Sequence, residues 1–286
     1  MGLIEGKVAI VTGAGAGLGR SYAKALAAEG AALVVNDFSA EAAEDTVREI
    51  VGTGGKAVTK VADVGDVAGG ASLLQTALEA FGRVDILVNN AGILRDTSFV
   101  KMDLSQWNAI MHVHLQALFA STQPVFTWMK ESGDGGVIVN TTSTAGIRGN
   151  FGQTNYGAAK CGVIGFTTAL AIEGKKYGIR VWNIGPAAAT ALTAHMPEEY
   201  QRQFHIDRVA PTLLYMVSDL SGDQTGKTLL AGGGWVGECR FEVHNGYVPT
   251  DKITPQEIAK AADSGKIFFP ERPGKWVTAY GPQNDN

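Results

Sequence analysis

Residues 7–19 read KVAIVTGAGAGLG, and this stretch decides the fold. Its first six residues are mostly apolar and β-branched, which predicts a short buried strand. The glycines that follow let the backbone turn tightly, and a helical pattern then covers residues 20–29 until Gly30 ends it. A strand, a glycine-rich turn and a helix in this order favour a phosphate-binding turn at the start of the helix.

The same alternation continues through the rest of the chain. Further predicted strands cover residues 32–36, 56–61, 84–88, 136–140, 179–184 and 228–231. Helical patterns lie between them at 41–51, 71–81, 105–130, 156–176 and 207–220. Alternating strands and helices without internal repeats predict an α/β fold, a single doubly wound parallel sheet of the Rossmann type with helices on both faces. Ligands of such a sheet bind at the carboxyl ends of its strands.

The ends of the first two strands predict contacts to the phosphates and a ribose of a dinucleotide. The turn residues are Gly13, Gly17, Leu18 and Gly19. There the positive end of the helix dipole would face a pyrophosphate. Asp37 follows at the end of the second strand. Its carboxylate can accept hydrogen bonds from both ribose hydroxyls and would repel a 2′-phosphate, which favours NAD over NADP.

The third and fourth strands end in residues that predict contacts to the nucleoside parts of the same cofactor. Asp63 and Val64 are placed to hold the adenine edge, although Asp63 also fits an ordinary helix cap. Asn90, Ala91 and Gly92 are small enough to let a nucleoside lie close, and a plain turn is the alternative. The shared position of both groups at strand ends favours the cofactor interpretation.

A serine, a tyrosine and a lysine predict proton transfer to or from an alcohol oxygen. Tyr156 and Lys160 are four residues apart and share one face of a predicted helix, and Ser143 precedes them. A phenol has a pKa of about 10, and a nearby ammonium lowers that pKa because it favours the phenolate. A serine hydroxyl can hold the substrate oxygen within reach of the phenol. Taken alone, the Tyr–Lys pair also fits an ordinary surface pair on a helix.

The bulk composition excludes several classes of function. The net charge is −4 with no basic block, so we expect no nucleic-acid or anionic-membrane partner. No apolar run reaches about 18 residues, which predicts no membrane span, and we expect neither a secretory signal nor a peroxisomal address. Cys161 and Cys239 have no metal-ligand spacing. We therefore expect a reducing compartment, a cytoplasmic location and no metal.

The last part of the chain differs from the rest. We expect residues 1–244 to form the cofactor-binding and catalytic domain, and residues 245–286 to form an extension that packs on the body or on a partner subunit. Within the extension, residues 254–257 predict the start of a helix and Gly265 predicts its end. Partial disorder is the alternative. Residues 190–204 stand where a lid over an apolar substrate would lie.

Several of these motifs resemble the short-chain dehydrogenase/reductase family. The resemblance rests on residues 12–19, residues 89–92 and the set of Ser143, Tyr156 and Lys160. More specific stretches resemble the dehydrogenase unit of the peroxisomal type-two multifunctional enzymes, among them residues 90–96, 149–156, 233–237 and 253–257. This resemblance covers nearly all of the 286 residues.

The resemblance implies an NAD-dependent oxidoreductase that interconverts a secondary alcohol and a ketone on a bulky apolar substrate, most closely a (3R)-hydroxyacyl-CoA. A 17β-hydroxysteroid stays open as the alternative substrate. An NADPH-dependent 3-oxoacyl reductase and a non-catalytic nucleotide-binding protein stay open as well. The resemblance also implies a homodimer or homotetramer, with residues 105–130 and 157–176 at the interface. Candidate contact residues there are Leu118, Phe119, Val163 and Phe166, and the alternative is that some of them belong to the core.

The roles of the family's site residues carry over by position. Tyr156 matches the catalytic base, Lys160 matches the partner that lowers its pKa and binds a ribose, and Ser143 matches the hydroxyl that orients the substrate. Most of the family has an asparagine that anchors a proton-relay water at the position where this chain has His114. Two interpretations of His114 stay open: it takes over that role, or it is a buried histidine that satisfies a backbone carbonyl.

Overall fold

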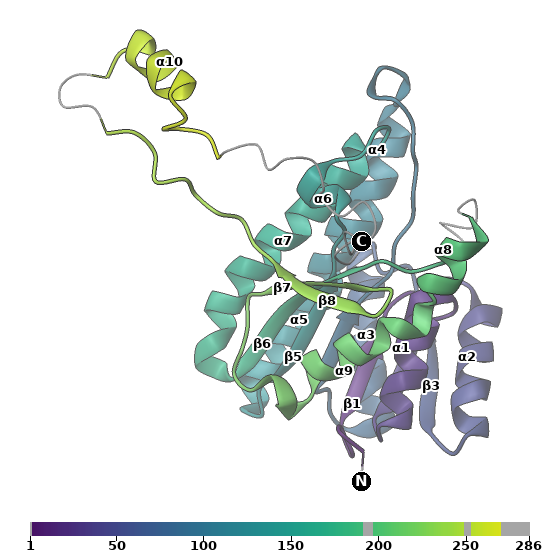
Figure 1. The fold of residues 1–286 in the computed structure, drawn as a ribbon. Helices are drawn as coiled ribbons and strands as arrows, with labels where there is room; N and C mark the ends of the chain where they lie inside the picture. Colours follow the sequence, from purple (N-terminus) through teal and green to yellow (C-terminus); the bar gives the residue numbers. More distant parts are fainter. Residues whose placement is uncertain (1, 191–196, 249–252, 270–286) are drawn as a thin grey trace. The chain divides into compact units, whose positions relative to one another are not determined.

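The structure is a computed structural model that describes residues 2–190, 197–248 and 253–269. It divides into two compact units, Met1–Cys239 and Arg240–Asn286. Among the described residues, the first unit contains a single eight-stranded sheet in the order β3-β2-β1-β4-β5-β6-β7-β8 (Figure 1). The predicted α/β fold with one doubly wound sheet is confirmed.

The strands are short and follow the predicted order. They are β1 Val8–Val11, β2 Ala32–Asp37, β3 Lys56–Val61, β4 Ile86–Asn89, β5 Gly136–Thr141, β6 Ile179–Pro186, β7 Thr228–Gly232 and β8 Trp235–Cys239. The pairs from β1 to β7 are parallel, and β1 lies between β2 and β4. The chain therefore reverses its direction of travel across the sheet at β1. The gap between β1 and β4 is the switch point at which such a sheet binds ligands.

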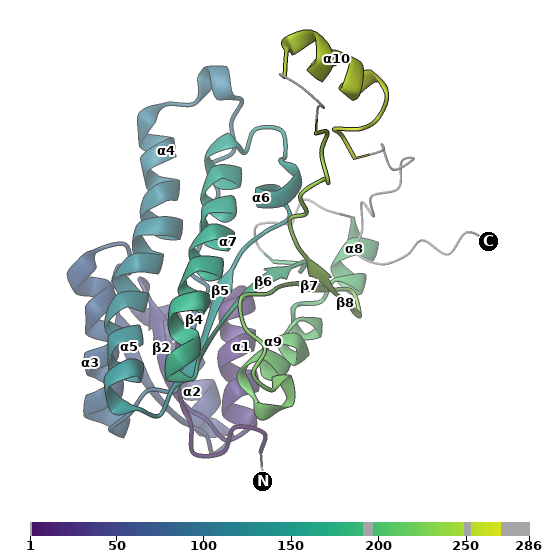
Figure 2. The same ribbon diagram turned by 90° about the vertical axis from the view of Figure 1, so that its left-hand side faces the viewer.

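The helices form a layer on each face of the sheet. They are α1 Gly17–Ala28, α2 Ala40–Gly52, α3 Val67–Phe81, α4 Leu104–Met111, α5 Ala117–Ser132, α6 Ala145–Arg148, α7 Thr154–Gly174, α8 Glu198–Gln203, α9 Ala210–Val217 and α10 Pro255–Asp263. The layer of α3, α4, α5 and α7 lies on one face, and α1, α2 and α9 lie on the other (Figure 2). In the part of the chain that the structure describes, no helix combines the length and apolarity needed to cross a bilayer.

Alternate residues of the central strands β1, β2, β4, β5 and β6 enter two separate apolar cores. Val11 of β1 belongs to the core cluster that contains Leu26 of α1. Its neighbour Ile10 belongs to the cluster on the opposite face, together with Leu73 of α3. All four side chains are fully buried. Burial on both faces explains why the strands are continuous apolar runs in the sequence.

The edge of the sheet differs from the predicted all-parallel arrangement, because β8 pairs antiparallel with β7. Gly233 and Gly234 join the two strands with φ of +61° and +89°. Positive φ at both central residues is what a two-residue hairpin turn of the favoured type requires, and glycine adopts it without strain. The sheet was expected to end at this glycine run, although two glycines between short apolar stretches also indicate a hairpin.

Two helices differ from their predicted bounds. The helix α3 begins at Val67, four residues earlier than predicted. Gly70 lies inside α3. A β-carbon at this position would come within 2.6 Å of the Ala120 backbone, so glycine lets α3 and α5 pack closely. The predicted helix over residues 105–130 is divided by a π turn, His112–Gln116, which joins α4 to α5. Apolar periodicity does not reveal such a turn, because it adds a residue without interrupting the helix.

The second unit contains the predicted helix as α10. A reciprocal capping box starts it: Glu257 N donates to the Thr254 hydroxyl at 3.2 Å, and Thr254 N donates to the Glu257 carboxylate at 3.0 Å. Gly265 follows the helix with φ of +70°. Part of the predicted lid, residues 191–196, lies outside the described residues, as does the end of the extension from residue 270 onward.

Candidate active site

The glycine-rich turn lies between β1 and α1, where the sequence predicted a phosphate contact. Gly13 and Gly17 adopt φ of +61° and +52°, which favours glycine. A β-carbon on Gly19 would lie 2.1 Å from the Gly13 carbonyl oxygen, so the turn folds directly against the helix. Ala16 gives α1 no side-chain cap, and Leu18 packs against the core below. The helix start thus carries no side chain that would compete with an anion, and the cradle fits a pyrophosphate.

Asp37 ends β2 and is fastened to this turn. One carboxylate oxygen accepts a hydrogen bond from Gly15 N at 2.9 Å, and the other accepts one from Ser39 N at 3.0 Å. The neighbouring cation Arg20 binds the carbonyl group of the same residue, because its Nε donates to Gly15 O at 2.9 Å. Arg20 also pairs with Glu49 at 3.3 Å. The guanidinium is therefore engaged by groups other than Asp37.

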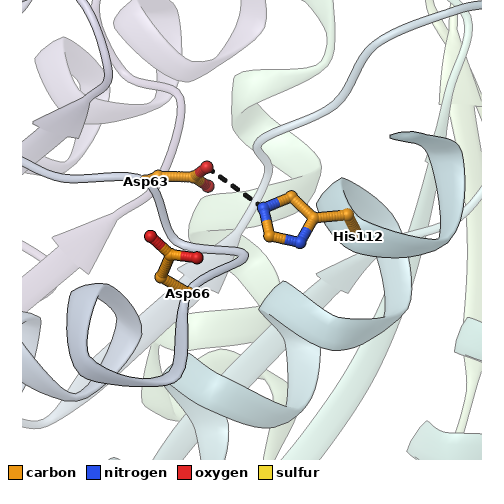
Figure 3. A group of neighbouring side chains, drawn as sticks. All are labelled: Asp63, Asp66 and His112. Atoms are coloured by element: carbon orange, nitrogen blue, oxygen red, sulfur yellow. Dashed lines mark hydrogen bonds and ion pairs between the residues drawn. The ribbon is translucent and has the colours of Figure 1, made fainter. Parts of the chain in front are cut away.

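Asp63 and Val64 follow β3 at the same edge of the sheet. Asp63 accepts a hydrogen bond from Gly65 N at 2.8 Å, and its second oxygen lies 3.0 Å from His112 Nε2 (Figure 3). Val64 is buried. Asp63, Asp66 and His112 each offer one possible ligand atom within 4.8 Å of the others. This grouping was not predicted from the sequence, because the histidine is distant from both carboxylates along the chain.

Side-chain hydrogen bonds fasten the end of β4 to the glycine-rich turn. Asn90 Nδ2 donates to the carbonyl oxygens of Thr12 at 3.0 Å and Gly13 at 3.2 Å. The Thr12 hydroxyl accepts from the backbone N–H of Asn90 at 2.9 Å and of Ala91 at 3.0 Å. Thr12 thus organises the surface where a nucleoside was expected. The sequence analysis gave it no role of its own, although it directly precedes the first glycine of the turn.

Tyr156 lies in the first turn of α7, which the neighbouring Asn155 anchors. Asn155 is fully buried. Its amide nitrogen donates to Arg95 O at 3.2 Å, and its oxygen accepts from Tyr156 N at 2.7 Å. These bonds fix the start of the helix and leave the tyrosine half-buried at its end. The sequence predicted the tyrosine but gave no role to the asparagine beside it.

Lys160 lies one helical turn later and is buried next to the tyrosine. It is 3% exposed, and its Nζ lies 5.6 Å from the centre of the Tyr156 ring. Nζ donates to Thr141 O at the end of β5 at 2.6 Å, and the Thr142 hydroxyl donates to Lys160 O at 2.8 Å. Burial lowers the pKa of Lys160 to about 7, because desolvation disfavours the ammonium. Near neutral pH the amine therefore occupies both protonation states.

His114, in the π turn, completes this group. Its ring meets the Tyr156 ring edge-on, with centroids 5.2 Å apart. Its Nε2 lies 2.9 Å from Ile93 O and 3.3 Å from Ile93 N, so the tautomer sets whether it donates or accepts. In the tautomer that donates to the nearer Ile93 O, Nδ1 is an acceptor. Burial, and then the charge of Lys160, lower the pKa of His114 to about 3, so the imidazole is neutral. Gly92 makes the approach possible, because a β-carbon there would lie 2.7 Å from His114 Cε1.

A cavity of about 20 Å³ lies among these side chains. That volume holds about one water molecule. Its lining includes His114, Thr141 and Lys160. His114 Nδ1 and Thr141 Oγ1 are buried and have no hydrogen-bond partner among the described residues. Two unsatisfied polar atoms beside a water-sized cavity indicate a water site. The carbonyl contact expected of a buried histidine is thus present, and Nδ1 leaves the relay interpretation open.

Ser143 follows β5 and begins the approach to α6. Its Oγ accepts a hydrogen bond from Ala145 N at 3.2 Å. The short helix α6 was not predicted, because four residues are too few for a helical pattern in the sequence. The structure thus brings His114, Tyr156 and Lys160 together, and Ser143 stands two residues beyond the carbonyl that binds Lys160.

Known proteins resemble this chain over most of its length. A family model described as short chain dehydrogenase matches residues 7–202. The chain is 45% identical over 260 residues to the peroxisomal hydratase-dehydrogenase-epimerase of Neurospora crassa. It is 42% identical over 267 residues to the peroxisomal multifunctional enzyme type 2 of Mus musculus. These matches cover 90% and 89% of this chain but only 28% and 36% of the two relatives, so the chain spans about a third of their length.

Relatives of similar length to this chain match as well. The 3-oxoacyl-[acyl-carrier-protein] reductase of Synechocystis sp. is 39% identical over 246 residues, which cover 82% of this chain and 99% of the relative. The crystal structure of a short chain dehydrogenase from Mycobacterium avium has a TM-score of 0.85 and 34% identity to this chain. That superposition covers 99% of this chain and 100% of the other, so the two structures agree on the fold.

Proposed function

The chain belongs to the short-chain dehydrogenase family and is an oxidoreductase with a nicotinamide dinucleotide cofactor; from this premise we propose that it oxidises a bulky apolar secondary alcohol, a (3R)-hydroxyacyl-CoA, with NAD. One observation carries the proposal: the Tyr156 ring lies beside both Lys160 and His114 at the carboxyl ends of the strands. A half-buried phenol beside a buried amine and a buried neutral imidazole can move a proton on or off an alcohol.

In the proposed reaction, Tyr156 acts as a phenolate and takes the proton of the substrate hydroxyl. Ser143 holds the substrate oxygen by a hydrogen bond. The ammonium form of Lys160, beside the tyrosine ring, favours the phenolate and so lowers the pKa of the phenol. When bound, the nicotinamide supplies the acceptor for the hydride that leaves the substrate carbon.

His114 is proposed to hold the water molecule through which the proton leaves the site. Its Nδ1 accepts a hydrogen bond from that water, and Lys160 lines the same cavity. The pKa of about 3 means that the imidazole orients the water rather than taking its proton. Thr141 Oγ1, the second unsatisfied atom, offers the water another partner.

The cofactor is proposed to be NAD and to lie across the switch point. Gly13, Gly17, Leu18 and Gly19 would hold its pyrophosphate, Asp63 and Val64 its adenine, and Asn90, Ala91 and Gly92 its second nucleoside. Asp37 would bind the adenosine ribose and repel a 2′-phosphate. Arg20 offers that phosphate little help, because Gly15 O and Glu49 engage it. We expect kcat/KM with NAD⁺ to exceed that with NADP⁺ at least about tenfold; equal values would refute the assignment.

The acyl-CoA substrate is proposed from the motifs that resemble the dehydrogenase unit of the type-two multifunctional enzymes. In support, the relative at 45% identity is named a peroxisomal hydratase-dehydrogenase-epimerase, and the relative at 42% identity is named a peroxisomal multifunctional enzyme type 2. The runner-up is a 17β-hydroxysteroid, which presents the same secondary alcohol on an apolar body. A 3-oxoacyl reductase that uses NADPH is a third candidate, favoured by the Synechocystis relative. Asp37 argues against that candidate, since it would face the extra phosphate of NADPH.

The deciding experiment is a substrate panel assayed for NADH appearance with the whole chain. It compares a medium-chain (3R)-hydroxyacyl-CoA with its (3S) enantiomer, estradiol and a small polyol. We expect the highest kcat/KM for the (3R) thioester. A preference for estradiol would select the steroid reading, and activity confined to the polyol would refute both. Faster reduction of a 3-oxoacyl thioester with NADPH than oxidation with NAD⁺ would select the reductase.

The compartment is a separate proposal. The sequence predicts a cytoplasmic protein, whereas the Neurospora crassa and Mus musculus relatives are named peroxisomal. We propose the cytoplasmic location, because two cysteines without metal-ligand spacing indicate a reducing compartment. A fluorescent fusion that accumulates in peroxisomes would refute it.

A further inference from the structure

His112 and Asp63 form a side-chain pair at the adenine end of the switch point. His112 Nε2 lies 3.0 Å from Asp63 Oδ2, and Gly65 N donates to Asp63 Oδ1 at 2.8 Å (Figure 3). The two bonds hold the carboxylate from both sides and so fix its plane. The hydrogen bond from His112, which is the main cause, holds the pKa of Asp63 below its usual range.

The glycine at position 65 is what allows this contact. A β-carbon there would lie 2.2 Å from His112 Nε2 and within 2.5 Å of two ring carbons. The imidazole therefore fills the space that a side chain of residue 65 would occupy. Gly65 is not among the residues with positive φ, so its backbone alone does not demand glycine. Glycine at position 65 therefore leaves room for the ring of His112.

The π turn explains how one helix reaches both ends of the cofactor site. His112 opens the turn and contacts Asp63, while His114, two residues later, contacts Ile93 and Tyr156. Residues two apart on a regular helix point in directions about 160° apart, so both contacts depend on the local geometry.

We infer that His112 is a positioning residue of the adenine subsite, which orients the Asp63 carboxylate toward the adenine of the cofactor. This inference rests on the proposed role of Asp63 in cofactor binding. His112 acts on the binding of the dinucleotide and not on the chemistry, because its contacts lie with Asp63 whereas the reacting group surrounds Tyr156. The nearby Asp66 carboxylate is exposed and takes no part in the pair.

The test uses the full chain and ADP-ribose, which carries the adenine end of the cofactor without the nicotinamide. Its dissociation constant is measured by calorimetry, alongside KM for NAD⁺ and kcat. His112→Leu removes the donor and keeps most of the volume, whereas His112→Gln keeps a nitrogen donor at a similar reach. Gly65→Ala keeps the backbone N–H and displaces the imidazole. Asp66→Asn is the matched control for a nearby carboxylate.

We expect His112→Leu to weaken ADP-ribose binding and raise KM for NAD⁺ about threefold to tenfold, the range for one hydrogen bond at a partly exposed site. The value of kcat at saturating NAD⁺ should not change. His112→Gln should restore binding to within about twofold, and Gly65→Ala should reproduce the His112→Leu defect. Asp66→Asn should bind normally. In an Asp63→Ala background, His112→Leu should add no further loss, because it acts through that carboxylate.

The outcomes separate this inference from the function on which it rests. If Asp63→Ala weakens ADP-ribose binding and His112→Leu does not, the positioning role is wrong and the cofactor site stands. If Asp63→Ala has no effect, or the wild type does not bind ADP-ribose, the proposed adenine site is wrong and the inference falls with it. An equal defect in Asp66→Asn that a chelator reproduces in the wild type would replace the hydrogen bond with a cation site.

Discussion

At the scale of single residues, the burial of Lys160 lowers the stability of the fold, although the proposed reaction needs this lysine. Its pKa falls from 10.5 to about 7 in the folded protein. We expect Lys160→Met to abolish turnover yet raise the free energy of unfolding at pH 7 by about 1–4 kcal/mol. Each unit of pKa depression corresponds to about 1.4 kcal/mol, and loss of the hydrogen bond to Thr141 O offsets part of the gain. Urea denaturation measures this change, and Lys101→Met, at an exposed lysine, is the control.

The same substitution has a pH dependence of defined sign. Between pH 7 and 10.5 the unfolded chain holds the lysine proton and the folded chain does not. The unfolding free energy contributed by Lys160 therefore rises with pH in this window. The advantage of the methionine variant should shrink toward pH 10 and be largest at or below pH 7. A methionine variant that is less stable than the wild type at pH 7 would contradict the pKa shift.

Tyr156→Phe tests the proposed proton acceptor. We expect kcat to fall at least about a hundredfold, in keeping with the loss of a general base. The dissociation constant for NADH should change little, because only the hydroxyl is removed and the ring still packs on His114. Stopped-flow turnover and fluorescence titration measure the two quantities, with Tyr177→Phe as the control. A variant that keeps a tenth of the wild-type rate would remove Tyr156 from the mechanism.

Which residues the sequence could reveal depends on how far apart along the chain they act. Tyr156 and Lys160 are one helical turn apart, so spacing alone placed them on one face. His112 and Asp63 are 49 residues apart and meet only through the π turn. The unsatisfied Nδ1 of His114 depends on tertiary burial in the same way. No local pattern encodes these contacts, so they emerge only with the fold.

At the scale of elements, a buried chain of hydrogen bonds crosses four strands in register. Asn89, Asn140, Asn183 and Thr228 face one another across β4 to β7. Asn89 donates to Asn140 at 2.8 Å, and Asn140 donates to Thr167 of α7 at 2.8 Å. Thr167 donates to Asn183 at 2.7 Å, and Asn183 donates to Thr228 at 3.1 Å. These hydrogen bonds join α7, the helix that carries Tyr156, to the sheet.

Thr167→Val should remove the two central hydrogen bonds of this series. The threonine is fully buried, so its loss leaves the amide of Asn140 and the oxygen of Asn183 without their partner. We expect the free energy of unfolding to fall by about 1–3 kcal/mol, the cost of leaving buried polar groups unpaired. Thr168→Val is the control, because that exposed hydroxyl bonds only to the preceding turn at Ile164. Equal denaturation midpoints for both variants would show that the chain adds no stability.

The elements themselves were largely predictable, because the central strands are buried on both faces and the connections carry turn residues. The exceptions have separate physical causes. The strand β8 follows from two positive-φ glycines, whose hairpin signal was read as an ending. The helix α3 begins earlier than predicted and contains Gly70. Glycine usually disfavours a helix, but at this position it lets α3 pack closely on α5.

At the scale of the whole molecule, burial within the fold reduces the set of predicted residues that can form the interface of the proposed homodimer or homotetramer. Of the predicted contact residues, Leu118 and Val163 are buried within the chain, while Phe119 is 48% exposed. Ile172 on α7 is 76% exposed. We expect Phe119→Glu to shift the wild-type oligomer toward monomer by light scattering at micromolar concentration. Val100→Glu, at another exposed apolar residue, should not. A monomeric wild type would end the proposal.

The proposed boundary near residue 244 makes a prediction for the isolated body. All residues of the two apolar cores lie before residue 240, and the buried Ala261 of α10, in the second unit, belongs to neither core. We therefore expect a chain ending at residue 244 to fold and to bind ADP-ribose with the affinity of the whole chain. Circular dichroism and calorimetry measure both. Loss of folding would show that the extension is part of the core structure.

The π turn limits which changes in chain length this protein can accept. Each residue of a regular helix advances the chain by about 100° around the axis. Deleting one residue from His112–Gln116 would restore regular geometry and rotate α4 against α5 by about that angle. The deletion would release either the adenine end or the reacting end of the site. A substitution in this segment can change the site by degrees. A change in the number of residues in the π turn would instead disrupt one end of the site.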